Sequence, residues 1–151
     1  MMNDIQSTLK FRNIKVETPN FYLGEKLKKK DLGGKEVWTM SSTAYIKWSA
    51  NNVEEKLKKK GYQLPSRAVT PMSQGYYPET DLSPEVDQYG ITIFQEFIGI
   101  LRWAVKIVRV DILTDISMLS SVPRKGHIKQ IHHIFEFLKK KSKLTFYFGP
   151  Q

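Results

Sequence analysis

Apolar residues recur at helical spacing in four stretches of the chain. The first stretch predicts a helix that begins at residues 41–43 and ends at Lys60, before Gly61. Its core stripe consists of Ile46, Ala50, Val53 and Leu57. Three later stretches, at about 92–108, 111–121 and 128–141, predict a small bundle of three amphipathic helices.

Two residues in the later helices carry structural expectations of their own. Gly99 interrupts the first helix of the bundle, and an interior glycine costs about 1 kcal/mol relative to alanine, so close helix packing is expected there. Asp111 is expected to cap the following helix. A shorter pattern at residues 4–10, with Asn3 or Asp4 as its cap, predicts one brief helical segment.

Two β-rich runs flank Gly33 and Gly34 and predict a hairpin. In its first arm, period-2 alternation is expected to separate a basic and aromatic face from a partly apolar one. The first face would carry Tyr22, Gly24, Lys26 and Lys28, and the second Phe21, Leu23, Glu25 and Leu27. A last apolar run at residues 144–148 predicts a short orphan strand, whose partner is expected in sequence outside this chain.

Together these elements predict an α+β fold. It consists of an N-terminal β-hairpin, a helix, a proline-rich connection, a three-helix bundle and the C-terminal strand. The expected parts are residues 1–61, 62–90, 91–142 and 143–151. The connection is long and irregular, and covering a surface or binding an extended ligand would each explain it.

Composition adds a partner class to this picture. The 151 residues carry a formal net charge of +9, and 40% of them are hydrophobic, which favours a folded basic domain over a disordered tail. A polyanion, most simply nucleic acid, is the expected partner, and a membrane surface is the weaker candidate. The absence of cysteine excludes disulfides and Cys-containing metal sites, and no apolar run is long enough to span a bilayer. An intracellular location, cytoplasmic or nuclear, is expected.

Catalytic patterns are weak in this sequence. His132, His133 and Glu136 have helical spacing, but no second group completes a metal-ligand set, so metal binding is not expected. The aspartates are scattered and form no pair able to hold two Mg²⁺ ions. No phosphate-binding glycine loop or nucleophile elbow is present.

Lysine runs are the strongest feature for binding. The hexapeptide E-K-L-K-K-K occurs at residues 25–30 and 55–60, and K-K-K-S-K covers residues 139–143. If the three runs face one side, they would form a surface that tracks phosphates; separate solvated clusters are the alternative. Nearby aromatics such as Tyr22 and Trp38 could stack on bases, although such residues are often simply core.

Several ordered motifs resemble the reverse transcriptase of copia-type LTR retrotransposon Pol polyproteins, downstream of the polymerase active site. They begin with F-Y-L-G at residues 21–24, W-T-M-S-S at 38–42 and V-T-P-M at 69–72. The most specific is F-Q-E-F-I-G-I-L-R-W-A at 94–104, which leads to R-V-D-I at 109–112 and P-R-K-G-H at 123–127.

This resemblance implies that the chain holds a primer-template duplex. Residues 1–61 would be the end of the palm with a primer-gripping hairpin and a helix, residues 91–142 the helical thumb and connection, and residues 143–151 the approach to an RNase H domain. The nucleic-acid-binding residues predicted from motif and charge are Tyr22, Leu23, Gly24, Lys26, Lys28, Lys29, Lys30, Trp38, Lys58 and Lys59.

The resemblance also implies that catalysis lies elsewhere. The family's Tyr-x-Asp-Asp motif would precede Met1 and the RNase H carboxylates would follow Gln151, so we expect a fragment that binds nucleic acid without polymerising. Mg²⁺ belongs to the parent polymerase, and no cofactor is expected in this chain. The alternatives are a free-standing basic nucleic-acid-binding protein and a retroelement relic without function.

Overall fold

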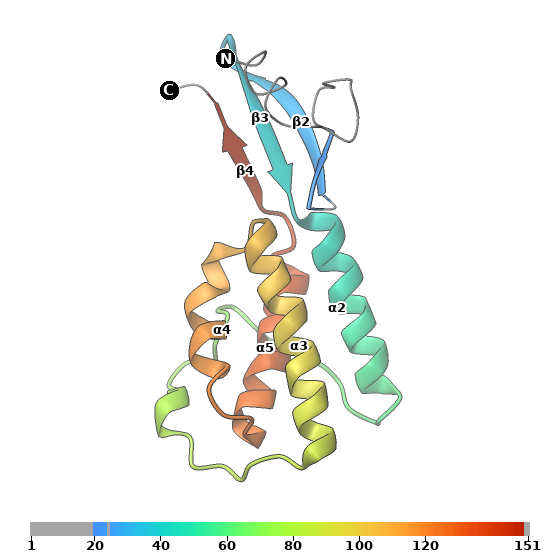
Figure 1. The fold of residues 1–151 in the computed structure, drawn as a ribbon, viewed down its shortest axis with the longest axis vertical. Coiled ribbons are helices and arrows are strands. Elements are labelled where there is room, and N and C mark those ends of the chain that lie inside the picture. The colour runs from blue at the N-terminus through green and yellow to red at the C-terminus, as the bar shows by residue number, and fades with distance from the viewer. Residues whose placement is uncertain (1–19, 24, 150–151) are drawn as a thin grey trace, which may run out of the picture.

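A computed structural model describes residues 20–23 and 25–149. Within them, a four-stranded antiparallel sheet stands as an arm at one end of a helical body (Figure 1). The predicted α+β class is confirmed. The helix expected at residues 4–10 and the position of Gly24 lie outside the described residues.

The sheet has the order β1-β2-β3-β4. Its strands are β1 (Phe21–Tyr22), β2 (Glu25–Leu32), β3 (Lys35–Ser41) and β4 (Thr145–Phe148). The predicted hairpin turn is confirmed, because Gly33 and Gly34 adopt positive φ angles of 65° and 86°, as a two-residue turn between twisted strands requires. The Gly34 N–H donates to Oδ1 of Asp31 at 2.7 Å and holds the turn.

The last strand has its partner inside the chain. The prediction of an orphan strand was wrong, because β4 pairs antiparallel with β3, from Ser41 opposite Thr145 to Trp38 opposite Phe148. Helix α5 (Lys125–Lys140) returns the chain to the base of the hairpin, where β4 begins (Figure 1). Pairing over so long a sequence separation leaves no local signal in the sequence.

The helical body contains α2 (Thr43–Lys58), α3 (Gln88–Ile107), α4 (Leu113–Leu119) and α5, together with 3-10 turns at Pro78–Thr80 and Val110–Ile112. All four helices contribute to one core, whose fully buried members include Ile46, Leu101, Ile112, Leu119, Ile131 and Phe135. The helix before the proline-rich connection therefore shares its core with the three that follow it. No helix among the described residues combines the length and apolarity needed to cross a membrane.

The first turn of α2 is held from the hairpin. Ser42 occupies the cap position, as predicted for residues 41–43, but its side chain makes no capping bond. Instead, Oε1 of the buried Glu25 accepts the Tyr45 N–H at 3.3 Å. Burial raises the pKa of Glu25, and the Tyr45 N–H partly opposes that rise. The other end of α2 lies at Lys58, two residues before the predicted end at Lys60. Gly61 ends the turn that follows, with a φ of 75°, and the Tyr62 N–H donates to the Leu57 carbonyl.

The connection between α2 and α3 covers the helical body. Ala68 is buried in the core, and Leu64, Met72 and Tyr76 pack against it. The Ser73 N–H donates to the Gln130 side chain at 2.9 Å, which ties the connection to α5. Of the two explanations for its irregular sequence, the structure supports the covering of a surface.

Two expectations for the C-terminal half were wrong. A Cβ placed on Gly99 would meet nothing within 4 Å, so no close helix packing compensates for this glycine. Asp111 does not cap α4, because it lies in the preceding 3-10 turn and binds Arg109 through two bonds of 2.9 and 2.7 Å. Arg109 is 1% exposed, and its guanidinium also donates to the Lys141 carbonyl. This pair joins the corner after α3 to the end of α5.

Candidate nucleic-acid interface

The sheet arm separates charge by face. Opposed residues in an antiparallel pair point to the same side, and neighbours along a strand alternate. One face, here called the basic face, carries Lys26, Lys28, Lys30 and Lys35, together with Phe21 and Tyr147. The three acidic residues of the hairpin, Glu25, Asp31 and Glu36, all lie on the other face. The basic face therefore presents positive charge without carboxylates of the hairpin beside it.

The basic face is accessible and regularly spaced. Its four lysines are exposed, Phe21 is 66% exposed and Tyr147 is 50% exposed. Alternate residues along β2 lie roughly 6.7 Å apart, close to the distance between successive phosphates of a nucleic-acid strand. Among the described residues, no carboxylate forms an ion pair with Lys26, Lys28 or Lys30. A row of ammonium groups at this spacing suits contact with a phosphate backbone.

Tyr22 lies on the opposite face from the one predicted. The prediction treated residues 21–30 as one strand, but the chain reverses after Tyr22, so that Tyr22 opposes Glu25 and Phe21 opposes Lys26. Leu23 makes this reversal with a φ of 51°, a conformation that non-glycine residues seldom adopt. Phe21, not Tyr22, is therefore the aromatic residue of this turn that joins the lysines.

Lys29 and Trp38 lie opposite each other on the same face as Tyr22, away from the basic face. The Nζ of Lys29 donates to Oε2 of Glu36 at 2.8 Å and lies 5.2 Å from the centre of the Trp38 ring. Tyr22 lines an apolar groove of about 270 Å³ on the same face, between the sheet and the end of α3. These three predicted residues are thus engaged within the arm or in its packing against the helical body.

Lys58 and Lys59 lie far from the hairpin lysines. Helix α2 leaves the sheet at Thr43 and places them at its other end, roughly 24 Å away for 16 residues (Figure 1). Lys58 pairs with Glu54, which also binds Lys139 at 2.7 Å. The three lysine runs therefore do not form one surface, and two of them are partly neutralised by Glu54.

Three residues of the basic face were missed by the sequence reasoning. Lys35 could have been predicted, because a two-residue Gly-Gly turn places it opposite Leu32, on the same side as Lys30. Phe21 was assigned to the wrong face with the rest of its strand. Tyr147 gave no signal, since its place depends on the pairing of β4 with β3.

The three residues with metal-like spacing do not converge on one point. The His133 ring lies 3.1 Å from the Thr70 carbonyl, Glu136 pairs with Lys140, and the His132 ring packs edge-to-face against Phe97. No three His, Asp or Glu side chains of residues 20–23 and 25–149 converge as metal ligands. The described residues therefore do not fit the Mg²⁺ that the resemblance implies for the parent polymerase.

A buried polar cluster joins the connection to the start of α5. Asp81 accepts hydrogen bonds from the Tyr76 hydroxyl and the Ser83 N–H, and its Oδ2 lies 3.9 Å from Nε2 of His127. Burial would raise the pKa of Asp81, but these hydrogen bonds and His127 outweigh it and lower the pKa to about 2. A Cβ on Gly126 would collide with the same carboxylate. This cluster positions α5 rather than forming an open site.

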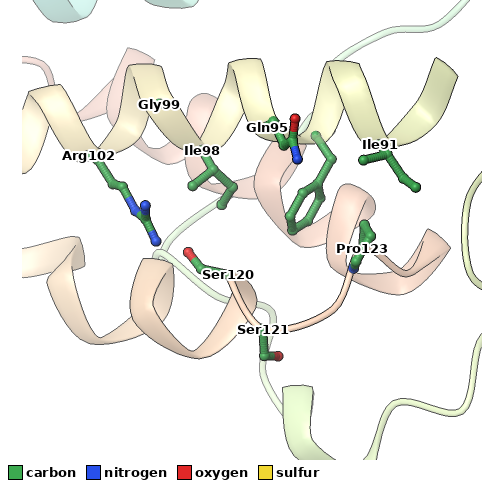
Figure 2. Close-up of a pocket in the computed structure, with 9 residues that line it drawn as sticks. Ile91, Gln95, Ile98, Gly99, Arg102, Ser120, Ser121 and Pro123 are labelled. Carbon is green, nitrogen blue, oxygen red and sulfur yellow. The ribbon is translucent and has the colours of Figure 1, made fainter. Parts of the chain in front are cut away.

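A separate groove of about 280 Å³ lies between α3 and the end of α4. Figure 2 shows Arg102 and Ser120 turned toward each other across it, with Gly99 on its wall. Its described lining carries a single charge, that of Arg102. The groove is therefore a weaker candidate for a polyanion than the basic face.

Comparisons of the chain with protein-family models, with curated proteins and with solved structures give no match. The assignment of function therefore rests on the geometry of the arm and on the sequence motifs.

Proposed function

We propose that this chain binds nucleic acid through the basic face of its sheet arm, and that it is the part of a copia-type reverse transcriptase that holds the primer-template duplex. The observation that carries the proposal is the segregation of charge on the arm. Four lysines and two aromatic residues share one face, and the acidic residues of the hairpin occupy the other.

The shape of the arm supports this role. The arm extends from the helical body (Figure 1), and the groove between the sheet and α3 lies on the opposite face, so the basic face is turned away from α3. Lysine contacts to phosphates provide affinity without reading sequence, which suits a polymerase that must hold any template. Phe21 and Tyr147 add surfaces on which an unpaired base can stack.

The motifs at residues 21–24, 94–104 and 123–127 support the narrower assignment to a reverse transcriptase. In that setting the arm would grip the primer-template duplex and the helices from α3 to α5 would act as thumb and connection. The sequence contains no adjacent pair of aspartates, so the chain would contribute binding and no polymerisation.

Fluorescence anisotropy with three labelled probes tests this function. The probes are an RNA–DNA hybrid with a recessed primer, a duplex DNA of the same length and a single strand. The proposal predicts binding of the hybrid at least as tight as that of duplex DNA, with affinity falling steeply with log salt. Failure to bind any of the probes at low salt would contradict it.

A primer-extension assay with Mg²⁺ or Mn²⁺ completes the test. We expect no synthesis by the chain alone, and template-dependent extension would contradict the assignment of binding without catalysis. Equal affinity for hybrid and duplex DNA, with tighter binding of single strands, would instead favour a free-standing basic binding protein. A purified chain that aggregates or lacks a cooperative unfolding transition would favour a relic.

A further inference from the structure

A cavity lies at the end of the helical body away from the sheet arm. Its volume is about 640 Å³, within the range of small-molecule sites. The end of α2, the first turn of α3 and the first two turns of α5 surround it. The basic face of the arm does not contribute to its wall.

Three lysines and no carboxylate line this cavity. They are Lys60, in the turn after α2, and Lys125 and Lys129 on α5. Lys125 and Lys129 are exposed and form no ion pair with a described carboxylate. The N-terminus of α5, the positive end of its dipole, lies in the same wall, whereas the N-terminus of α3 is capped by the Asp87 carboxylate, which accepts the Gly90 N–H at 2.8 Å. The rim of the cavity is therefore suited to an anion.

The interior of the cavity is apolar and aromatic. Leu57, Ile93 and Ile128 contribute aliphatic surface. Tyr62 and Tyr89 are 63% and 62% exposed, so each ring offers a surface to a ligand. Lys60 lies 4.0 Å from the centre of the Tyr89 ring and donates to its hydroxyl, which fixes one side of the opening.

His132 gives the lining an uncharged polar group. Its ring lies 5.9 Å from that of Phe97 in an edge-to-face arrangement, and its Nε2 is buried without a hydrogen-bond partner in the described part of the chain. Burial lowers the pKa of His132 to about 4, so the imidazole is neutral at pH 7. The charges of the cavity thus stay at its rim, and the interior suits a flat, uncharged ring.

We propose that this cavity binds a nucleotide, with the phosphate at Lys125 and Lys129 and the base against the tyrosines and the aliphatic wall. A cationic rim next to an aromatic interior matches a ligand that carries an anion and a flat ring at its two ends. The nucleotide is either free or an unpaired residue of a strand, because both present the same chemistry. This site is separate from the basic face and does not depend on its function.

Calorimetric titration with adenosine 5′-monophosphate, adenosine and inorganic phosphate tests the proposal. We expect the monophosphate to bind at least about tenfold more tightly than adenosine, because the phosphate adds charge-assisted contacts. K125Q combined with K129Q should abolish that advantage and leave adenosine binding unchanged. The pair K28Q and K30Q on the arm is the matched control and should leave both affinities unchanged, whatever its effect on duplex binding.

Two further readouts keep the proposal falsifiable. Tyr89→Ala should weaken the binding of both adenosine and the monophosphate. If that variant does not fold, NMR of the unaltered protein is the second readout: the His132 ring signals should shift when the monophosphate is added.

Competition distinguishes the two sources of the nucleotide. An oligoadenylate that competes with the monophosphate identifies a strand as a source, and competition by free nucleotides alone identifies the free ligand. No binding of the monophosphate, binding unaffected by K125Q with K129Q, or displacement by a short fatty acid but not by nucleotides would overturn the proposal.

Discussion

The Nζ of Lys30 lies 5.7 Å from the centre of the Tyr147 ring. The two residues are far apart in sequence and meet because β4 pairs with β3, which itself pairs with β2. Tyr147 thereby joins the basic face, and the end of the described chain completes the surface that the hairpin begins.

Tyr147→Ala is expected to weaken binding of a single-stranded oligonucleotide about tenfold, because one stacked base contributes roughly 1–3 kcal/mol. Tyr147→Phe keeps the ring and should retain the affinity. Anisotropy titrations at constant salt provide the measurement. Equal losses in the two variants would show that the hydroxyl, and not the ring, makes the contact.

Gly99→Ala is expected to stabilise the protein by about 1 kcal/mol, since alanine is the better helix former and the added methyl group meets open space. Urea denaturation of both proteins measures the difference. Gly90→Ala, also in α3, is the control and should destabilise, because its Cβ would lie 2.7 Å from that of Val86. If Gly99→Ala were destabilised, the finding that a Cβ at this position meets open space would be contradicted.

Asp111→Asn is expected to destabilise the protein by about 2 kcal/mol, because it leaves the buried Arg109 guanidinium without its counter-charge. The partial exposure of Asp111 keeps the effect below that of a fully buried pair. Asp115→Asn in the next turn is the control. Burial and the nearby Asp111 raise the pKa of Asp115, so neutralising it should cost little. Urea denaturation measures the unfolding free energy of both variants. Similar losses in the two would contradict a stabilising role for the ion pair between Arg109 and Asp111.

Asp81 predicts a loss of stability in acid. Its pKa is lowered to about 2 in the folded state from an ordinary value of 3.8, so its contribution is complete above about pH 4 and disappears as the pH falls toward 2. The size of that contribution is on the order of 2 kcal/mol. The difference in unfolding free energy between the unaltered protein and Asp81→Asn should therefore narrow over this range. If the difference in unfolding free energy were the same at pH 7 and near pH 2, the lowered pKa of Asp81 would be contradicted.

The parts of the fold that depend on local sequence could be predicted. The Gly33-Gly34 turn follows from the positive φ angles that glycine adopts without strain, and Gly61 marks the turn after α2 in the same way, although the helix itself ends two residues earlier than predicted. The apolar stripe of α2 also identified its buried residues, since Ile46, Ala50 and Val53 are all fully buried.

The errors arose where distant contacts or an unusual backbone decide the structure. The reversal at Leu23 could not be predicted, because leucine at a φ of 51° opposes the ordinary preference of the residue. That single reversal moved Tyr22 to the face opposite the one predicted. Asp111 has the residue type of a helix cap, but Ile112 occupies the cap position and the Asp111 carboxylate binds the buried Arg109 instead.

The candidate site was predicted only in part for the same reason. Lys26, Lys28 and Lys30 follow from alternation along one strand, and they lie together as expected. Lys58 and Lys59 share a sequence motif with them but are separated by the length of α2. The same hexapeptide therefore lies on two different surfaces, in a strand at residues 25–30 and at the end of a helix at residues 55–60.

The salt dependence of hybrid binding, measured on two charge-matched variants, tests the central claim most directly. K28Q with K30Q removes two charges from the basic face, and K58Q with K59Q removes two from the far end of α2. The account predicts that K28Q with K30Q makes the fall of log affinity with log salt shallower by about 1.8 in slope, while K58Q with K59Q leaves the slope unchanged. Equal losses of slope in the two variants would contradict the assignment of nucleic-acid binding to the arm.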